Sequence, residues 1–475
     1  MGKKDTITPQ ACLPLADIPM ALAADVTVAF GGEQPIHGAR FTQDVASLTS
    51  ELRRCKASRW ALCFDDSYWF AVAFMAACHS GKQLVLPGNY QAGALAALQP
   101  HFDALLTDAA TDIASQLCGS VIQLPDHLGN TLAPLTSLMP EQISLTLFTS
   151  GSSGTPKAIR KHLGLLQAEI QGLQRQWGAA LTGCSIVSTV SHQHIYGLLF
   201  RILWPLCAGM PFARHDLTYP EQVMAAATPD NCLISSPALL KRLGNETAGL
   251  PYRQLFSSGG PLPSQAAADC LALFGQLPLE IFGSTETGGI AYRQQYSEQT
   301  PWRLFPDHAM TLTADGCILL KSAFVHPDDC LDGWYRTSDC ADMLDEQHFS
   351  LQGRSDRIVK IEEKRISLVE VERYLCQLDW LDDAVALPLD DGQRLSVAAV
   401  ICLSDKGKTE LNRLGKGKFK LALRSALRHY LEPVGIPRRL RMLDEIPVNS
   451  QGKRQYQMLY QLFTAETEDQ QQEKQ

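Results

Sequence analysis

Leu147-Phe148-Thr149-Ser150-Gly151-Ser152-Ser153-Gly154-Thr155-Pro156-Lys157 is the most informative stretch of this chain. The apolar run that leads into it, 143–148, is typical of a buried strand. Hydroxyl side chains, glycines and a lysine follow, and we expect an amphipathic helix to begin near Ala158. Backbone N–H groups and hydroxyls, with one ammonium beside them, suit a polyphosphate. The stretch does not end in the Gly-Lys-Ser/Thr of the common P-loop, so the sequence predicts a different kind of nucleotide site.

Length and composition indicate an ordinary globular protein. The 475 residues allow roughly two to four domains. A hydrophobic content of 45% and a charged content of 19% are not those of a disordered chain. The 14 cysteines are scattered without a Cys-x-x-Cys pair, which favours a reducing compartment. We therefore expect a cytoplasmic protein.

Neither a membrane nor a nucleic acid is an expected partner. No apolar run follows Lys3 and Lys4, so no signal peptide is visible. The most apolar segments, 68–78 and 198–210, are shorter than the roughly 20 residues of a membrane span, and Arg201 interrupts the second. The net charge of −8 argues against nucleic-acid binding by the whole molecule.

The charge is unevenly spread along the chain. Lys and Arg dominate Lys406–Arg441, and the segment that also includes Asp405 carries a net charge near +8, which leaves about −16 for the remainder. Two interpretations stay open: a solvated helix face, or a docking surface for an anionic partner.

The chain is expected to fold as α/β structure with mainly parallel sheets. Short apolar runs alternate with helical patterns from about residue 20 to 350. The runs are Trp60–Phe64, Gln83–Leu86, Ser185–Val190, Asn231–Ser235 and Leu279–Phe282. Beyond Gly353 we predict a small α+β domain with strands at Ala384–Leu389, Leu395–Leu403 and Arg439–Leu443 and a helix at Lys418–Leu431. The predicted division is 1–352 for the large domain, 353–465 for a small mobile domain, and 466–475 for a disordered tail.

Four further clusters carry polar groups at turns. They are Ile281-Phe282-Gly283-Ser284-Thr285-Glu286-Thr287-Gly288-Gly289, Gly333-Trp334-Tyr335-Arg336-Thr337-Ser338-Asp339, Gly353-Arg354-Ser355-Asp356-Arg357, and Pro447-Val448-Asn449-Ser450-Gln451-Gly452-Lys453-Arg454. A carboxylate such as Glu286 suits a hard metal such as Mg²⁺. Taken singly, such a cluster is better explained as an ordinary turn, cap or solvated side chain.

Taken together and in this order, the five motifs resemble the adenylate-forming superfamily. That superfamily comprises acyl- and aryl-CoA synthetases, peptide-synthetase adenylation domains and luciferases. The resemblance runs from about Leu147 to Arg454. It implies a large N-terminal α/β domain, a small C-terminal domain that rotates about a hinge, and the cofactors ATP and Mg²⁺.

The resemblance implies a role for each motif residue. The ATP phosphates would be held by Thr149, Ser150, Gly151, Ser152, Ser153, Gly154, Thr155 and Lys157. The adenine would lie beside Gly259, Gly260 and Phe282, where the family usually has Tyr in place of Phe282. Thr285 would contact the α-phosphate, and Gly283 and Ser284 before it would also belong to the cofactor-binding segment. Glu286 would hold Mg²⁺, Asp339 and Arg354 would bind the ribose, Lys453 would be the catalytic lysine, and Asp356 would be the hinge.

The acyl pocket is expected at His192-Gln193-His194-Ile195-Tyr196-Gly197. By resemblance His194 acts in catalysis, where it lies near the substrate carboxylate or gates the acyl tunnel, while Tyr196 and Gly197 wall the pocket. His192 is expected to be a polar turn residue. An aromatic residue at position 196 is also common for packing alone, so both interpretations of Tyr196 stay open.

Two features leave the thiol acceptor open. Glu363 stands where the family normally has Gly beside the pantetheine arm, which puts ordinary CoA use in doubt. The basic segment Lys406–Arg441 would attract an acidic acyl carrier protein, although it could also bind a CoA phosphate. The segment Glu363-Lys364-Arg365-Ile366-Ser367-Leu368 resembles ligases of bacterial aryl-polyene and xanthomonadin-type pigment pathways, which implies a 4-hydroxybenzoate-like acid.

The sequence thus predicts an AMP-forming ligase that joins a small carboxylic acid to the thiol of CoA or of a phosphopantetheinyl carrier protein. One alternative is an enzyme that stops at adenylation or uses a non-thiol acceptor. Another is a non-catalytic, nucleotide-dependent binding module of the same fold. A kinase or P-loop ATPase is not favoured, because the complete P-loop pattern is missing.

Overall fold

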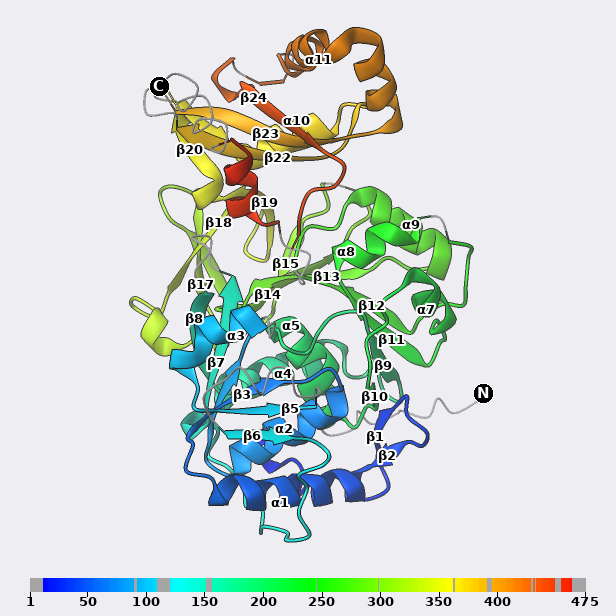
Figure 1. Cartoon of the computed structure of the whole chain (residues 1–475), viewed down its shortest axis with the longest axis vertical. Coiled ribbons are helices and arrows are strands. Elements are labelled where there is room, and N and C mark those ends of the chain that lie inside the picture. Colours follow the sequence, from blue (N-terminus) through cyan, green and yellow to red (C-terminus); the bar gives the residue numbers. More distant parts are fainter. Residues whose placement is uncertain are drawn as a thin grey trace. The chain divides into compact units, whose positions relative to one another are not determined.

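A computed structural model describes most of the chain and divides it into two compact units (Figure 1). The described residues are 12–88, 92–108, 120–150, 156–244, 246–297, 299–361, 364–390, 395–428, 430–431, 433–448 and 454–463. Unit 1 comprises Met1–Gly151, Thr155–Met310 and Leu320–Tyr335; unit 2 comprises Ser152–Gly154, Thr311–Leu319 and Arg336–Gln475. Each unit is described below by itself. The domain boundary at residue 353 stays a prediction, and the tail 466–475 lies outside the described residues.

The first sheet of unit 1 has the strand order β6-β5-β3-β4-β7-β8. All neighbours pair in parallel except β7 and β8, which are antiparallel. The strands are β3 (Arg59–Cys63), β4 (Gln83–Leu86), β5 (Ala104–Thr107), β6 (Ser120–Gln123), β7 (Ser144–Ser150) and β8 (Pro156–His162). The helical elements of this part are η1 (Leu15–Asp17), α1 (Gly38–Arg54), α2 (Ser67–His79), α3 (Ala92–Leu98), η2 (Gln99–His101), η4 (Pro140–Gln142) and α4 (Leu163–Trp177).

The second sheet of unit 1 is parallel from β1 through β10, β9, β11 and β12 to β13, and antiparallel at both ends. Its strands are β1 (Thr27–Phe30), β2 (Ile36–His37), β9 (Ser185–Ser188), β10 (Phe212–Ala213), β11 (Asn231–Ser235), β12 (Gln254–Ser257), β13 (Leu279–Ser284), β14 (Gly288–Gln294) and β15 (Trp302–Leu304). The helical elements are α5 (Ile195–Gly197), the π-helix η5 (Leu198–Leu203), α6 (Trp204–Ala208), α7 (Pro220–Ala225), α8 (Pro237–Leu240), η6 (Lys241–Leu243), α9 (Ser264–Phe274) and η7 (Pro327–Asp329). The α/β fold class and the parallel sheets expected from the alternation are confirmed.

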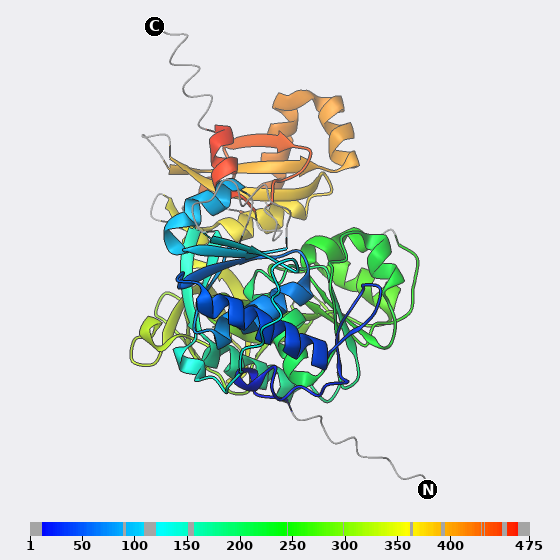
Figure 2. The same cartoon turned by 60° about the horizontal axis from the view of Figure 1, so that its bottom comes forward.

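Helix α2 lies in the main core of unit 1, beside α1 (Figure 2). Every residue of α2 except Trp69 is buried. A helix that is apolar all round is buried in a large core or a membrane, and this one is a core helix. That explains why segment 68–78 is so hydrophobic. No helix within the described ranges has both the length and the apolar character needed to cross a bilayer.

The prediction of a helix beginning near Ala158 was wrong. Pro156–His162 forms strand β8, and helix α4 begins at Leu163. Strand β8 pairs along its whole length with β7, from Ser144 opposite His162 to Ser150 opposite Pro156. Burial alternates along the strand, because Ile159 and Lys161 are buried while Ala158 and Arg160 are exposed. This period of two indicates a strand, and the charged residues had concealed it.

Strands β16 (Ala309–Leu312) and β17 (Cys317–Lys321) precede β18 (Tyr335–Met343) and β19 (His348–Arg354) in the sheet order β16-β17-β18-β19. Unit 2 continues with η8 (Ser355–Arg357), the hairpin of β20 (Ile358–Ile361) and β21 (Lys364–Ser367), and α10 (Leu368–Cys376). A sheet of β22 (Leu381–Asp390), β23 (Leu395–Leu403) and β24 (Arg439–Leu443) carries α11 (Asp405–Leu427), then η9 (Pro433–Gly435) and a last helix over 456–463. The strands predicted at 384–389, 395–403 and 439–443 are confirmed.

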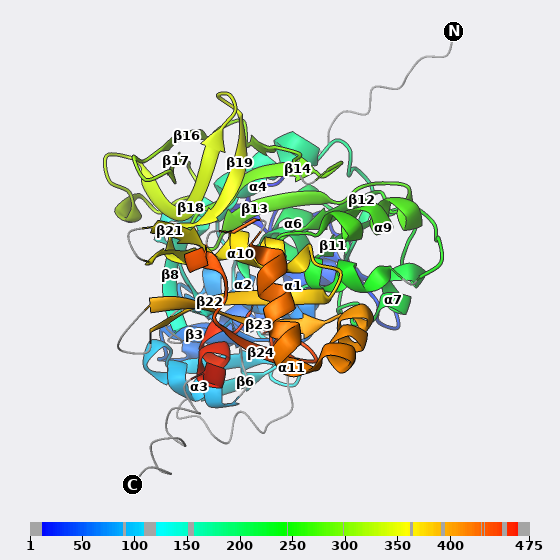
Figure 3. The same cartoon turned by 90° about the horizontal axis from the view of Figure 1, so that it is seen from above.

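Helix α11 is longer than the helix predicted at Lys418–Leu431 and consists of two segments, which Figure 3 shows at an angle to each other. The break is at Gly415, whose φ of 75° is a conformation that glycine adopts readily. Phe419, Leu423 and Leu427 of the second segment are buried in the core of unit 2. The first segment contains Gly407-Lys408-Thr409, a Gly-Lys-Thr inside a helix that no glycine-rich loop precedes.

Phe256 on β12 should be a main contributor to the stability of unit 1. Its buried ring lies 5.2 Å from the rings of both Trp177 and Phe200 and 6.2 Å from that of Trp204. We expect Phe256→Ala to lower the free energy of unfolding by about 3–5 kcal/mol, because the cavity cannot be refilled. Leu271→Ala on α9, where the side chain is 45% exposed, is the control and should change it by less than about 0.5 kcal/mol. Denaturant unfolding followed by tryptophan fluorescence compares the two, and equal effects would contradict the assignment.

Candidate active site

The predicted phosphate-binding loop connects the adjacent strands β7 and β8. Thr149 and Lys157 lie opposite each other in that pair, so the loop begins and ends at the same place in the sheet. Ser150 ends β7, and its side chain is not described. The predicted loop residues Gly151, Ser152, Ser153, Gly154 and Thr155 lie outside the described residues.

Lys157 and Glu286 are brought together in unit 1. Lys157 Nζ donates to Glu286 Oε1 at 2.6 Å, between residues 129 positions apart in the chain. Both line a cavity of about 230 Å³. The other residues of its wall are Ala158, Ile159, Arg160, His326, Asp329 and Tyr335. The cavity therefore combines cationic side chains with two carboxylates, which suits a phosphate–metal complex.

The turn between β13 and β14 presents Thr285 and Glu286 in a fixed geometry. The Ser284 amide donates to Thr287 Oγ1 at 3.0 Å, and Thr287 Oγ1 donates to the Gly288 carbonyl at 2.8 Å. A Cβ at Gly283 would lie 2.1 Å from the Gly288 oxygen, so only glycine fits there. The predicted residues Gly283, Ser284 and Thr285 thus belong to one hydrogen-bonded hairpin tip.

The Glu286 carboxylate is held in its ionised form. Burial raises its pKa, but the hydrogen bond and the charge of Lys157, together with hydrogen bonds from the Glu286 backbone and the Ser284 side chain, outweigh burial, so the pKa lies below its usual range. Magnesium commonly binds through one or two carboxylates together with substrate phosphates. Within the described ranges no group of three or more acidic, His or Cys side chains forms a closed metal cage. The donor set thus fits Mg²⁺ brought in with a nucleotide, and Glu286 is the carboxylate that would bind it.

The adenine-side residues lie in the same unit. Gly259 has a φ of 97°, which favours glycine, and a Cβ at Gly260 would meet no other atom within 4 Å. Phe282 is half-buried on β13, and its ring lies 5.5 Å from that of Trp302. The guanidinium of Arg293 lies 4.5 Å from the centre of the Trp302 ring. An aromatic surface is therefore present where a base is expected to stack.

The predicted acyl segment lies at α5. His194 is half-buried and directly precedes this helix, and a Cβ at Gly197 would lie 2.1 Å from the Ser191 oxygen. The Tyr196 ring lies 4.9 Å from Phe200, and burial raises its pKa well above the usual range. The segment thus places an aromatic ring, packed against the core of unit 1, beside a half-buried histidine.

His192 lies in the expected turn but is a buried residue. Its Nε2–H donates to the Phe64 carbonyl at 2.9 Å, and its Nδ1 accepts from the Ser67 hydroxyl at 3.0 Å. Burial, and then the nearby charge of Arg201, lower its pKa well below 6.5. His192 therefore anchors the segment before His194 through two buried hydrogen bonds.

Unit 2 contains the other described motif residues. Asp339 and Arg354 are opposite each other in the β18–β19 pair, with Arg354 Nη1 3.7 Å from Asp339 Oδ1. Thr337 Oγ1 accepts from the Asp339 amide at 3.1 Å. Asp356 lies in η8, and its side chain is not described. Lys453 and Glu363 lie outside the described residues.

Sequence reasoning missed Lys161 and Glu169, which are buried behind the Glu286 hairpin. It also missed Arg160, His326 and Asp329 in the cavity wall. The signal for Lys161 was available: on a strand, positions 157, 159 and 161 share one face. Recognising β8 would have placed both lysines on the side of Glu286.

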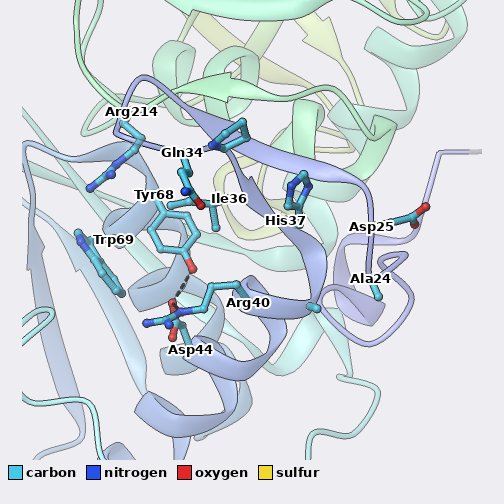
Figure 4. Close-up of a pocket in the computed structure, with 12 residues that line it drawn as sticks. Ala24, Asp25, Gln34, Ile36, His37, Arg40, Asp44, Tyr68, Trp69 and Arg214 are labelled. Carbon is cyan, nitrogen blue, oxygen red and sulfur yellow. Dashed lines mark hydrogen bonds and ion pairs between the residues drawn. The ribbon is translucent and has the colours of Figure 1, made fainter.

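A larger cavity, of about 640 Å³, contains none of the predicted site residues (Figure 4). Its wall combines residues of the β1–β2 hairpin, α1 and α2 with Arg214. Asp44 accepts hydrogen bonds there from the Tyr68 hydroxyl at 2.6 Å and from Arg40 Nε at 2.8 Å. Arg214 is paired with Asp66. These charges are mutually satisfied, so the cavity gives no indication of a ligand.

A parallel α/β fold with a polar cavity at the end of a strand, here beside Lys157 and Glu286, is typical of nucleotide-handling enzymes. A family model described as "AMP-binding enzyme" matches residues 41–312, more than half of the chain. The chain belongs to the AMP-binding enzyme family.

Relatives of the chain carry ligase names. It is 29% identical over 311 residues to a 4-coumarate–CoA ligase of Rhodobacter capsulatus, covering 64% of this chain and 73% of the relative. It is 26% identical to a 3-hydroxybenzoate–CoA/4-hydroxybenzoate–CoA ligase of Thauera aromatica, and the match covers 73% of this chain and 72% of the relative. It is 24% identical to a D-alanine–D-alanyl carrier protein ligase of Staphylococcus aureus, and the match covers 75% of this chain and 78% of the relative.

Solved structures show the same fold at low identity. ATP-bound MatB from Rhodopseudomonas palustris matches with a TM-score of 0.78 and 17% identity over 95% of this chain and 98% of that one. The o-succinylbenzoate coenzyme A synthetase MenE from Bacillus subtilis with AMP matches with a TM-score of 0.76 and 18% identity over 93% and 97%. The expected superfamily and fold are therefore confirmed.

The buried His192 should make stability depend on pH. Native His192 stays neutral where an unfolded histidine, with a pKa of about 6.5, takes up a proton. The unfolded state then binds more protons, so acidification below about pH 6.5 lowers the free energy of unfolding by up to about 1.4 kcal/mol per pH unit. His192→Gln should make this dependence shallower, as measured by denaturant unfolding at a series of pH values. His215→Gln, at an exposed histidine, is the control, and an unchanged slope in His192→Gln would contradict the assignment.

Proposed function

We propose that this protein is an ATP-dependent acid–thiol ligase. It joins a carboxylic acid to the α-phosphate of ATP, releases pyrophosphate, and passes the acyl group from the acyl-adenylate to a thiol. The observation that carries the proposal is the Lys157–Glu286 pair on the cavity at the end of the phosphate loop. The ligase names of the relatives support the same reaction class.

The residues divide the chemical work by their charge. Lys157, at the end of the loop, would neutralise the leaving pyrophosphate. Glu286 would hold Mg²⁺, which when bound screens the phosphate charges. Lys453 would stabilise the charge that builds on the α-phosphate as the carboxylate attacks. Asp339 and Arg354 would hold the ribose. Asp356 would serve as the hinge that removes Lys453 before the thiol enters.

We further propose an aryl acid of the 4-hydroxybenzoate type as the substrate. His194 would lie near its carboxylate, and Tyr196 and Gly197 would border the ring. Apolar and aromatic side chains surround Tyr196, which favours a flat, compact acid over a flexible chain. The hydroxybenzoate and coumarate ligases among the relatives point in the same direction.

A pyrophosphate-exchange screen tests this function. Benzoates, cinnamates and fatty acids are offered with ATP and labelled pyrophosphate, and we expect the largest exchange with hydroxybenzoates. Exchange that is largest with fatty acids would refute the aryl preference alone. Absence of pyrophosphate exchange with every acid would instead favour the non-catalytic binding module. The thioester yield with CoA and with a holo carrier protein then shows which thiol is the acceptor. If neither gives a thioester, the enzyme either stops at adenylation or uses a non-thiol acceptor.

The variant Lys453→Ala tests the proposed catalytic lysine in the same exchange assay. It should lower exchange by at least about 10²-fold, because a single electrostatic contact to a transition state contributes that much. Lys406→Ala is a suitable control, since Lys406 is an exposed lysine of unit 2 paired with Asp379 at 2.9 Å. Circular dichroism checks that both variants fold, and unchanged exchange in Lys453→Ala would remove the role assigned to Lys453.

For the second half-reaction we propose an acidic acyl carrier protein as a partner. The structure divides the basic segment at Gly415. Before it, Lys406, Lys408 and Arg413 are each paired with a carboxylate. After it, several cations have no ion-pair partner within the described part of the chain: Lys416, Lys418, Lys420, Arg424 and Arg439. Arg424, Arg441 and Arg439 also lower the pKa of Lys420, after burial as the first cause, so like charges gather here without compensation. Such a patch steers an anionic partner.

Charge reversal tests the carrier protein. Lys418→Glu with Arg439→Glu should raise KM for the holo carrier about tenfold at low salt, because long-range attraction is lost. The effect should shrink with added salt. The matched control, Lys406→Glu with Arg413→Glu, lies on the other segment and should change this KM far less. A rise in KM for CoA with no change for the carrier would instead assign the patch to a CoA phosphate.

A further inference from the structure

Lys161 is a buried charge at the back of the proposed Mg²⁺ ligand. Its residue is only 2% exposed, and Nζ donates to the Glu286 carbonyl at 3.1 Å and to the Phe324 carbonyl at 2.8 Å. Burying an ammonium costs several kcal/mol unless it is compensated. A neutral hydrogen-bond donor could bridge the same two carbonyls at a lower desolvation cost. We therefore expect the positive charge of Lys161 to have a role beyond packing.

Glu169, on helix α4, supports the same hairpin from its other strand. Its Oε1 accepts from the Gly289 amide at 2.7 Å, and the side chain is also buried. Lys161 and Glu169 are close enough to affect each other's pKa. Burial raises the pKa of Glu169, and the positive charge of Lys161 reduces that rise. The charge of Glu169 likewise opposes the fall that burial causes in the pKa of Lys161. Each of the two buried charges thus favours the ionised form of the other, while the Glu286 carboxylate of the same hairpin pairs with the exposed Lys157.

Strand β8 therefore contacts Glu286 at two points. Lys157 and Lys161, four residues apart, share one face of the strand. Lys157 pairs with the Glu286 carboxylate, and Lys161 bonds to its main-chain carbonyl. Once a nucleotide draws Lys157 away, the Lys161 contact would still hold the backbone of Glu286. The two lysines thus have different roles: one exposed and exchangeable, the other buried and fixed.

We infer that Lys161, balanced by Glu169, is a positioning residue that fixes the main chain of Glu286 so that its carboxylate is oriented for the Mg²⁺ that accompanies ATP. This rests on the proposed function only through the identity of the nucleotide and metal. Residues behind a metal ligand commonly change metal affinity by 10–100-fold when they are replaced. Neither residue touches the substrate, so neither is a catalytic residue.

ATP binding with and without Mg²⁺ tests the inference. Calorimetry in excess Mg²⁺ and in EDTA gives the factor by which Mg²⁺ tightens ATP binding. Lys161→Met should reduce that factor about tenfold and leave the EDTA affinity within about twofold of the wild type. The sign of the change is informative: if Lys161 acted only by its charge, removing a cation near the metal would strengthen the Mg²⁺ effect. A larger factor in Lys161→Met would therefore overturn the positioning role, and so would an unchanged one.

Lys82→Met is a matched control in the same unit. Lys82 Nζ also donates to two main-chain carbonyls, those of Cys55 at 2.7 Å and Ala57 at 2.8 Å, and it lines neither cavity. We expect it to lower the thermal midpoint while the Mg²⁺ factor stays at the wild-type value. Equal loss of the Mg²⁺ factor in both variants would reduce Lys161 to a structural residue.

Two more variants keep the test decisive if Lys161→Met does not fold. Lys161→Arg retains a charged donor and should restore part of the Mg²⁺ factor. Glu169→Gln keeps the shape but removes the negative charge that most offsets the burial of Lys161, and should lower the factor. Unaltered factors in both variants would overturn the inference. ATP binding needs no acid substrate, so a protein that binds Mg-ATP but exchanges no pyrophosphate fails the ligase proposal alone. If the wild type binds no ATP, both proposals fail.

Discussion

The antiparallel pairing of β7 with β8 is the constraint on which the candidate site depends. It returns the chain beside itself after the phosphate loop and places Thr149 opposite Lys157. It also turns Lys157 and Lys161 toward the β13–β14 hairpin, more than a hundred residues further along the chain. A helix starting at Ala158 would have distributed these side chains around its axis. The strand brings a phosphate-handling loop and a metal-binding carboxylate into one polar cluster.

The sequence was sufficient wherever the signal was local. Apolar runs such as Asn231–Ser235 and Leu395–Leu403 became strands with those same bounds, because a short continuous apolar run is typical of a strand whose two faces are both buried. The order of the five motifs was sufficient for the superfamily. It was not sufficient at Pro156–His162, where four basic residues masked a period of two. The partner that makes this segment a strand is β7, and pairing of that kind is not written in the segment itself.

Buried charge was the other feature that local patterns could not predict. Lys161, Glu169 and Arg201 look like surface residues, yet each is buried. What makes their burial possible is the set of carbonyls, amides and opposite charges that distant elements supply. His192 is similar: its turn was expected, but the hydroxyl and the carbonyl that satisfy its ring come from residues about 125 positions earlier. Conversely, the charge excess of Lys406–Arg441 was visible at once. Only the pairing of its members showed that the uncompensated part begins after Gly415.

The tip of the β13–β14 hairpin has an evolutionary consequence. Gly288 has a φ of 65°, and a Cβ built on it would lie 2.3 Å from Glu169 Oε2. A side chain at 288 is therefore blocked by the backbone conformation and by the carboxylate behind it. Shortening residue 169 would relieve the collision but would remove the negative charge that most offsets the burial of the Lys161 ammonium. Positions 161, 169 and 288 can thus drift only as a set, and in descendants of this chain they should be inherited together or lost together.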